Sequence, residues 1–279
     1  MTRTIVMAFH KYTPFGGEFY NPILKFQLRN LQKYYTYPYH EFDKLYLVDS
    51  NWDIGDSIDP RDVPYTVLKV DPSLRYYDAY KEVLPQIKED LVLFMDNDMV
   101  VYKPDIIAST FRQFRDIVDL DNNGEEIKGY DVVSIMDTIG TWKTDKLLLG
   151  NKFCPYWFAT RKNLLMKYLG VDWSPDSMPD FETLGKLTKA MVEDGIKTWE
   201  MADDKTEVTN WNPLETGKTL GYYHIRAGST IAYLLATKKY GNIKTYDDYI
   251  ENQPHSEIVR HCQWYAYMGG NPTEIYNDL

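Results

Sequence analysis

The sequence predicts an α/β domain whose mostly parallel central sheet is flanked by helices. Two observations favour this fold class. Short apolar, β-branched segments such as residues 4–9 and 91–95 recur along the chain, and segments with apolar residues at helical spacing separate them. Parallel neighbours in a sheet need a crossover connection, which such helices supply. No linker and no internal repeat interrupts the 279 residues, so we expect a single domain over residues 1–279.

In the first half of the chain, residues 1–129, prolines mark two of the predicted helices. Pro22 fits the first position of a helix, whereas Pro85 should bend or break one. The polar, turn-rich segment 119–129 predicts a surface loop. The predicted strands cover residues 4–9, 42–50, 65–71 and a segment that begins at 91, and the predicted helices cover 21–35, 76–90 and 105–114.

In the second half, residues 130–279, glycines mark the ends of two predicted helices, because glycine readily takes the left-handed conformation that ends a helix. Gly170 follows the first of these helices and Gly195 follows the second. The predicted helices cover residues 161–170 and 180–195, the predicted strands cover 130–137, 154–160 and 220–229, and the remainder is expected to be mostly helical.

The composition argues against several classes of protein. A formal net charge of −10 argues against nucleic acid or an anionic membrane as the main partner. No segment approaches the ~20 consecutive apolar residues of a membrane helix, and the N-terminal residues do not resemble a secretory signal. Cys154 and Cys262 are the only cysteines, so a disulfide framework and a cysteine zinc site are both excluded. We therefore expect a cytoplasmic protein with no membrane span.

The segment LVLFMDNDMVVYKPD, residues 91–105, carries the main chemical signal. Ligands of α/β sheets bind beyond the carboxyl ends of the strands, and this strand ends in Asp96, Asn97 and Asp98. In an extended chain, residues two apart point to the same side, so both carboxylates could converge on one Mg²⁺ or Mn²⁺ ion. Such an ion could neutralise a diphosphate. A simple turn explains the same residues, since Asp and Asn are common at strand ends.

Three other functions share parts of this signal. Haloacid-dehalogenase-like phosphatases also end a strand in Asp-x-Asp, but on the first strand of the chain rather than the fourth. A nucleotidyltransferase should carry a glycine-rich phosphate loop after the first strand, and TPFGGEF at residues 13–19 matches this poorly. A non-catalytic nucleotide-sugar-binding relic would keep the same sheet and lose turnover.

Read together, several segments resemble the GT-A glycosyltransferases of the nucleotide-diphospho-sugar transferase superfamily, especially the inverting family-2 type. The resemblance covers roughly residues 4–200 and lies in the order and spacing of the segments. They are LYLVDSNWD at 45–53, LVLFMDND at 91–98, Lys103-Pro104-Asp105, CPYWFATRKNLLMKYLG at 154–170 and PDFETLGKLTKAMVEDGIK at 179–197.

The chain departs from the family pattern at three places. Pro179-Asp180 replaces the usual Glu-Asp pair, and Lys186 replaces the usual arginine of the following helix. The Arg-Asn that usually precedes the Asp-x-Asp strand is not distinct in the segment LRYYDAYK. At these places the acceptor and the details of donor binding do not follow from the family pattern.

The resemblance implies a nucleoside-diphosphate sugar as donor, bound in the half that spans residues 1–129, and Mn²⁺ or Mg²⁺ as cofactor. Asp98 would be the main metal ligand, and Asp96 would contact the donor ribose or the metal shell. Asp49 would accept a hydrogen bond from the nucleotide base, and His10 would border that base. A turn or capping role explains Asp49 equally well, and a surface histidine explains His10.

Three later or neighbouring residues complete the implied donor site. His224 would be a third metal ligand, and Arg75 and Arg226 would bind the diphosphate, for which the bidentate geometry of arginine is suited. A buried core histidine and a solvated arginine are the alternatives for His224 and Arg75.

On the acceptor side, in the half that spans residues 130–279, the resemblance implies an inverting transfer to a hydroxyl group. Asp180 would act as the general base, with Glu182 as the fallback. Because Asp is also a favoured residue at the start of a helix, a capping role is the alternative for Asp180. The sequence does not identify the acceptor, which could be a glycan or a small molecule; the acidic net charge disfavours a modified nucleic-acid base.

Overall fold

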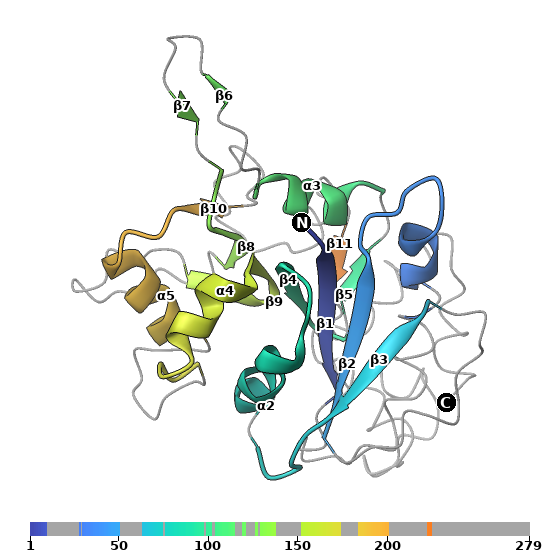
Figure 1. Cartoon of the computed structure of the whole chain (residues 1–279), viewed down its shortest axis with the longest axis horizontal. Coiled ribbons are helices and arrows are strands. Elements are labelled where there is room, and N and C mark those ends of the chain that lie inside the picture. Colours follow the sequence, from blue (N-terminus) through green and yellow to red (C-terminus); the bar gives the residue numbers. More distant parts are fainter. Residues whose placement is uncertain are drawn as a thin grey trace, which may run out of the picture.

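The computed structural model describes residues 1–9, 28, 30–50, 63–74, 76–97, 99–101, 104–114, 119–120, 126–127, 129–137, 152–173, 184–200 and 222–224. Within this part of the chain, seven strands form one sheet (Figure 1). They are β1 (Arg3–Phe9), β2 (Lys44–Asp49), β3 (Tyr65–Lys69), β4 (Leu91–Met95), β8 (Val132–Asp137), β9 (Lys152–Arg161) and β10 (Thr198–Glu200). Their order across the sheet is β10-β8-β9-β4-β1-β2-β3.

The sheet is mostly parallel, as the sequence predicts. Strand β1 lies parallel to both β2 and β4, β3 lies parallel to β2, and β10 lies parallel to β8. Only β9 runs in the opposite direction among these seven described strands, and it pairs antiparallel with β4 and β8. The strand order reverses at β1, because β2 and β3 extend the sheet on one side of it and β4 lies on the other. Such a switch point is where ligands bind in open α/β sheets.

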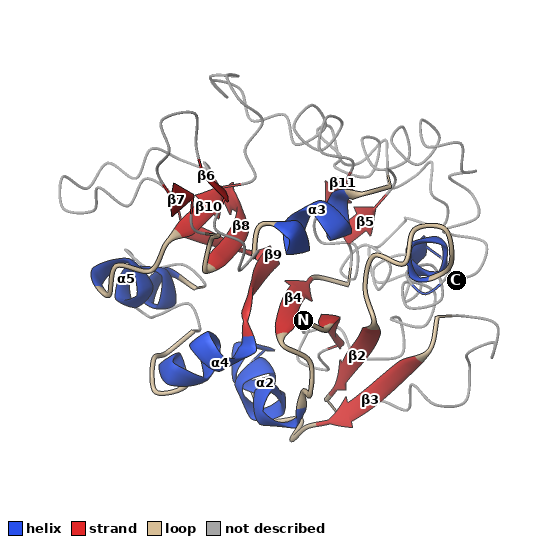
Figure 2. Cartoon of the chain, turned by 45° about the horizontal axis from the view of Figure 1, so that its top comes forward, coloured by secondary structure: helices blue, strands red, loops and turns tan. Residues whose placement is uncertain are grey.

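Helices cover both faces of the sheet (Figure 2). Helices α2 (Tyr76–Val83), α4 (Lys162–Leu165) and α5 (Gly185–Glu193) pack on one face, where Val6 and Ala8 of β1 point. Helix α3 (Ile106–Arg112) and a helix that includes residues 30–35 pack on the other face, where Ile5, Met7 and Phe9 point. Because both faces are covered, β1 is apolar at nearly every position instead of alternating.

Two small sheets accompany the large one. Strand β5 (Met99–Val101) follows β4 and pairs antiparallel with β11 (Tyr222–His224). Strands β6 (Asp119–Leu120) and β7 (Glu126–Ile127) pair with each other and project away from the main sheet at the upper left of Figure 1. No helix in the described part of the chain is long and apolar enough to cross a membrane.

The structure corrects several predicted boundaries. Helix α2 ends at Val83 and continues as one 3₁₀ turn, η2 (Leu84–Gln86), as expected from Pro85. The helix predicted over 180–195 begins only at Gly185, because Leu184 precedes it in a left-handed conformation with a φ of 61°. Its last residue is Glu193, and Gly195 follows the C-cap Asp194 with a φ of 72°, in agreement with the prediction that this glycine stops the helix.

Three further differences concern short elements. Helix α4 covers one turn and tightens into the 3₁₀ helix η3 (Met166–Tyr168), so the predicted helix 161–170 ends before Gly170. The predicted surface loop 119–129 contains the pairing of β6 with β7. Strand β10 was not predicted, since three residues give too short a pattern. The start of the helix predicted at 21 and the tail after 224 lie outside the described residues.

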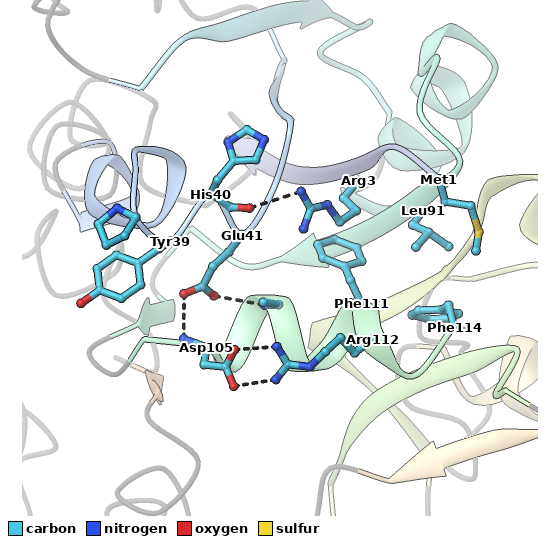
Figure 3. A pocket seen from close by; sticks show the side chains of 12 residues that line it. Met1, Arg3, Tyr39, His40, Glu41, Leu91, Asp105, Phe111, Arg112 and Phe114 are labelled. Atoms are coloured by element: carbon cyan, nitrogen blue, oxygen red, sulfur yellow. Dashed lines mark hydrogen bonds and ion pairs between the residues drawn. The ribbon is translucent and has the colours of Figure 1, made fainter. Parts of the chain in front are cut away.

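A buried carboxylate fixes the start of α3, the helix that follows β5. Glu41 is 1% exposed, and its two carboxylate oxygens accept hydrogen bonds from the backbone N–H groups of Asp105, at 2.7 Å, and Ala108, at 3.0 Å (Figure 3). These are N-terminal N–H groups that have no partner inside a helix. A negative charge at this position also interacts favourably with the helix dipole.

We expect Glu41→Gln to lower the free energy of unfolding by about 1–3 kcal/mol, because the new amide NH₂ would face a buried N–H donor and leave it unsatisfied. Urea unfolding followed by circular dichroism measures this. Arg112→Gln is the matched control, since it removes the half-exposed ion pair of Arg112 with Asp105 nearby and should cost less than ~1 kcal/mol. Equal losses in the two variants would contradict the capping role of Glu41.

Candidate functional site

The carboxyl ends of β1, β2 and β4 meet at one edge of the sheet, on both sides of the switch point. Asp49 ends β2 in register with Phe9 of β1, and both Asp49 and the following Ser50 are buried. The backbone carbonyl of Asp49 accepts a hydrogen bond from Val70 at 2.9 Å. Since neighbouring strands lie ~4.8 Å apart, Asp49 lies about 10 Å across the sheet from the end of β4.

Strand β4 ends in a tight turn at Asp96. The backbone N–H of Met99 donates a hydrogen bond to the carbonyl of Asp96 at 3.1 Å, which is the pattern of a β-turn. The prediction that the Asp-x-Asp residues form an extended segment is therefore wrong, because this turn interrupts the strand between β4 and β5. The half-exposed Asp96 lies at the start of the turn. Asp98 lies outside the described residues, between Asn97 and Met99 in the chain.

Two side chains bind the backbone of β1 beside this turn. The side-chain amide of Asn97 donates to the carbonyl of Ala8 at 3.0 Å. The hydroxyl of Tyr80, on α2, accepts from the N–H of Ala8 at 3.2 Å. Asn97 is 8% exposed, so its amide belongs to the protein interior. The backbone N–H and the backbone carbonyl of Ala8 are thus both hydrogen-bonded to side chains at the switch point.

A second pair of side chains holds strand β5, which follows the turn. The side-chain amide of Asn30 donates to the carbonyl of Val101 at 2.7 Å and accepts from its N–H at 3.1 Å. The hydroxyl of Tyr34 donates to the same carbonyl at 3.1 Å. Burial raises the pKa of Tyr34 far above its ordinary value, so this hydroxyl keeps its proton and its hydrogen bond at neutral pH.

Strand β11 brings a late segment of the chain to the same turn. His224 is the antiparallel partner of Met99, Tyr223 of Val100 and Tyr222 of Val101. Antiparallel partners have Cα atoms about 4.5–5.5 Å apart. The backbone of His224 therefore lies beside the residue that directly follows Asp98 in the chain.

The remaining candidates lie outside the described residues: His10, Arg75, Asp180, Glu182 and Arg226. The residue that precedes helix α5 as its N-cap is Leu184, whose side chain makes no capping hydrogen bond. Both roles weighed for Asp180, general base and helix cap, stay predictions.

A divalent cation would find a suitable donor set at the β4–β5 turn. Hard oxygen ligands such as carboxylates suit Mg²⁺ and Mn²⁺, and an imidazole is also compatible with Mn²⁺. Asp96 and Asp98 would supply the oxygens, and His224 the nitrogen. Among the residues whose side chains are described, no three acidic, histidine or cysteine side chains form a metal-binding group, so the complete set depends on Asp98 and His224.

A cavity of about 530 Å³ lies at the opposite, amino edge of the sheet, between α3 and the starts of β1 and β4 (Figure 3). Its charged groups are bound within the protein. Arg3 pairs with Asp43 and donates to the carbonyl of His40, and Arg112 makes two hydrogen bonds to Asp105. Since ligands of parallel sheets bind at the carboxyl edge, this cavity is not the candidate site.

Sequence reasoning missed four residues whose side chains bind the backbone near the turn: Asn97 and Tyr80, which bind β1, and Asn30 and Tyr34, which bind β5. The role of Asn97 could have been inferred, because it is a polar residue inside an apolar segment, at the centre of Asp-x-Asp. The roles of Asn30, Tyr34 and Tyr80 could not be predicted, because their partners lie about 70 positions away in the chain.

No family model matches the sequence, and no curated protein is significantly similar to it. Solved structures with a similar chain path include the mannosyltransferase PcManGT from Pyrobaculum calidifontis in complex with GDP-Man and Mn²⁺. The identity is 13% and the TM-score 0.48, over 97% of this chain and 76% of that one. The galactosyltransferase LgtC, in complex with donor and acceptor sugar analogs, matches at 13% identity and a TM-score of 0.40, over 59% of each chain.

A third similar structure is a nucleotidyltransferase rather than a glycosyltransferase. CMP:2-keto-3-deoxy-manno-octonic acid synthetase, complexed with CTP, matches at 13% identity and a TM-score of 0.44, over 85% of this chain and all of that one. Identities of 13% and TM-scores below 0.5 do not carry the activities of these proteins over to this chain.

Proposed function

We propose that this protein is a metal-dependent glycosyltransferase that moves a sugar from a nucleoside-diphosphate sugar to an acceptor hydroxyl, with inversion. One observation carries the proposal: the β4–β5 turn, with Asp96 at its start, lies at the carboxyl edge of the sheet at the switch point, and β11 lies beside it. This is where an α/β sheet binds ligands, and the Asp-Asn-Asp sequence of the turn supplies ligands for a cation.

On the donor side, Asp98, Asp96 and His224 would hold Mn²⁺ or Mg²⁺. When bound, such an ion neutralises the charge of the departing nucleoside diphosphate. Arg75 and Arg226 would bind the diphosphate oxygens. Asp49 at the end of β2, and His10 after β1, would border the nucleotide base on the other side of the switch point. The buried position of Asp49 supports a fixed acceptor for one directed hydrogen bond.

On the acceptor side, Asp180 would take the proton of the acceptor hydroxyl as its oxygen attacks the anomeric carbon, with Glu182 as the fallback. The new carbon–oxygen bond forms on the face opposite the bond to the diphosphate, which breaks, so the configuration inverts. The sequence supports this role, because Asp180 precedes helix α5 in the segment that resembles the acceptor side of the family-2 enzymes.

Asp98→Ala should remove the gain in nucleoside-diphosphate affinity that Mn²⁺ provides, because the main oxygen ligand is lost. We expect a loss larger than the ~10–100-fold that is typical for residues supporting a metal ligand. Calorimetric titration with ADP, GDP, UDP and CDP, with and without Mn²⁺, measures it. Arg112→Gln, at the opposite edge of the sheet, should bind like the wild type. An Asp98→Ala variant with the full metal-dependent gain would refute the proposed metal site.

His224→Ala distinguishes a metal ligand from a packed core residue. If His224 binds the cation, the variant should lose metal-dependent nucleotide affinity and keep a melting temperature close to that of the wild type. If it is only packed in the core, a large-to-small substitution should instead cost ~2 kcal/mol or more of stability. Thermal unfolding and calorimetry on the same sample separate these results, and normal metal affinity in a destabilised variant would reject the ligand role.

Asp180→Asn should fold normally and bind nucleotide normally, while transfer falls by ~10²–10⁴-fold, which is the usual contribution of a general base. The reason is that Asn keeps the shape of Asp and cannot accept the proton. Chromatography of the products gives the rate, and NMR coupling at the anomeric position gives the configuration. Full activity in the variant, retained configuration, or release of pyrophosphate in place of a nucleoside diphosphate would each exclude this mechanism.

A further inference from the structure

We infer that Asn97 is a positioning residue that holds the metal-binding turn against β1. This inference rests on the proposed function, because it concerns how the cation ligands on either side of Asn97 in the chain are kept in place.

The two edges of β1 form backbone hydrogen bonds with different strands. The carbonyl of Phe9 accepts from Ser50, which follows β2, and the carbonyl of Thr2 accepts from Leu91 at the start of β4. Since the backbone groups of successive residues in a strand point to alternate edges, Ala8 points to the same edge as Thr2. Ala8 therefore directs its N–H and its carbonyl towards β4.

Strand β4 does not reach Ala8. Its pairing with β1 ends at Val6 and Phe94, whereas the pairing of β1 with β2 continues to Phe9 and Asp49. Beyond Phe94 the chain turns away into the β4–β5 turn. The backbone N–H and carbonyl of Ala8 therefore have no hydrogen-bond partner on β4. An unsatisfied buried backbone group costs free energy comparable to a lost hydrogen bond.

Two side chains supply the hydrogen bonds that β4 does not make with Ala8. Tyr80 binds the N–H of Ala8 at 3.2 Å, and Asn97 binds its carbonyl at 3.0 Å. Only the second bond connects β1 to the turn itself, because Tyr80 belongs to α2. The hydrogen bond of Asn97 therefore holds the β4–β5 turn close to β1, although the backbone pairing of β4 with β1 has already ended.

The amide group of Asn97 suits this place for a chemical reason. The carbonyl of Ala8 needs a donor, and a neutral amide supplies one without adding charge between the carboxylates of Asp96 and Asp98. An Asp at this position would direct an oxygen at the carbonyl oxygen and add a third negative charge. A Leu has almost the same shape and no donor. Residues that orient metal ligands in this way typically change metal affinity by ~10–100-fold when they are replaced.

The test compares Asn97→Leu and Asn97→Ser with Tyr80→Phe, which removes the other hydrogen bond to Ala8 and substitutes no residue of the turn. Free Mn²⁺ is measured by electron paramagnetic resonance during titration of the full chain, with Mn²⁺ alone and with ADP, GDP, UDP or CDP. Melting temperatures are recorded on the same samples. We expect both Asn97 variants to bind Mn²⁺ about 10–100-fold more weakly, and Tyr80→Phe to melt at a lower temperature with Mn²⁺ affinity within about twofold of the wild type.

Two results would overturn the inference and keep the proposed function: Asn97 variants that bind Mn²⁺ as tightly as the wild type, or a loss of affinity that is equal in Tyr80→Phe. A wild-type protein that binds no Mn²⁺ under any of these conditions would overturn the proposed function, and the inference with it. If Asn97→Leu does not fold, Asn97→Ser decides, because its smaller polar side chain cannot span the distance that the amide covers.

Discussion

The candidate site depends on the position at which the hydrogen-bond ladder between β1 and β4 ends. Up to Val6 and Phe94 the two strands are held by their backbones. Beyond that point Asn97 connects the turn after β4 to β1, and Tyr80 of α2 binds the remaining backbone group of Ala8. A longer ladder would carry β4 straight past Ala8 and leave no turn at the switch point. A ladder without these replacements would leave two buried backbone groups unsatisfied, which a folded core rarely tolerates.

At the opposite edge of the sheet, buried polar groups also need hydrogen-bond partners, and charged side chains supply them. There the charged side chains are paired with one another or with backbone groups, as in the cap that Glu41 forms on α3 and the two-bond contact of Arg112 with Asp105. The bonds of Glu41 connect the segment before β2 to the helix that follows β5. The chain is therefore bound at two places, by Asn97 within the turn and by Glu41 at the start of α3.

Most of the strands were predictable because burial on both faces of the sheet leaves a continuous apolar segment, as in β1 and β4. The position of Asp96 at the end of β4 was predictable for the same reason, since Asp96 breaks such a segment. The geometry of the turn was not, because the alternation rule holds only while the chain stays extended. The start of α5 was missed because the left-handed conformation of Leu184 has no signature in the sequence. The bonds of Asn30, Tyr80 and Asn97 were missed because each joins a side chain to the backbone of a distant segment.

The reversed strand β9 has a consequence for how this protein can change over evolution. Because β9 runs antiparallel to both neighbours, β8 and β10 point in the same direction as β1, β2 and β4. Among the described strands of this sheet, the chain therefore leaves at one common edge after Phe9, Asp49, Lys69, Met95, Asp137 and Glu200. A segment inserted after any of these six strands adds to the rim along this edge, while the packed layers beneath it stay unaltered. A lineage could thus change what binds at this edge by lengthening or replacing these connections, without having to rebuild the core.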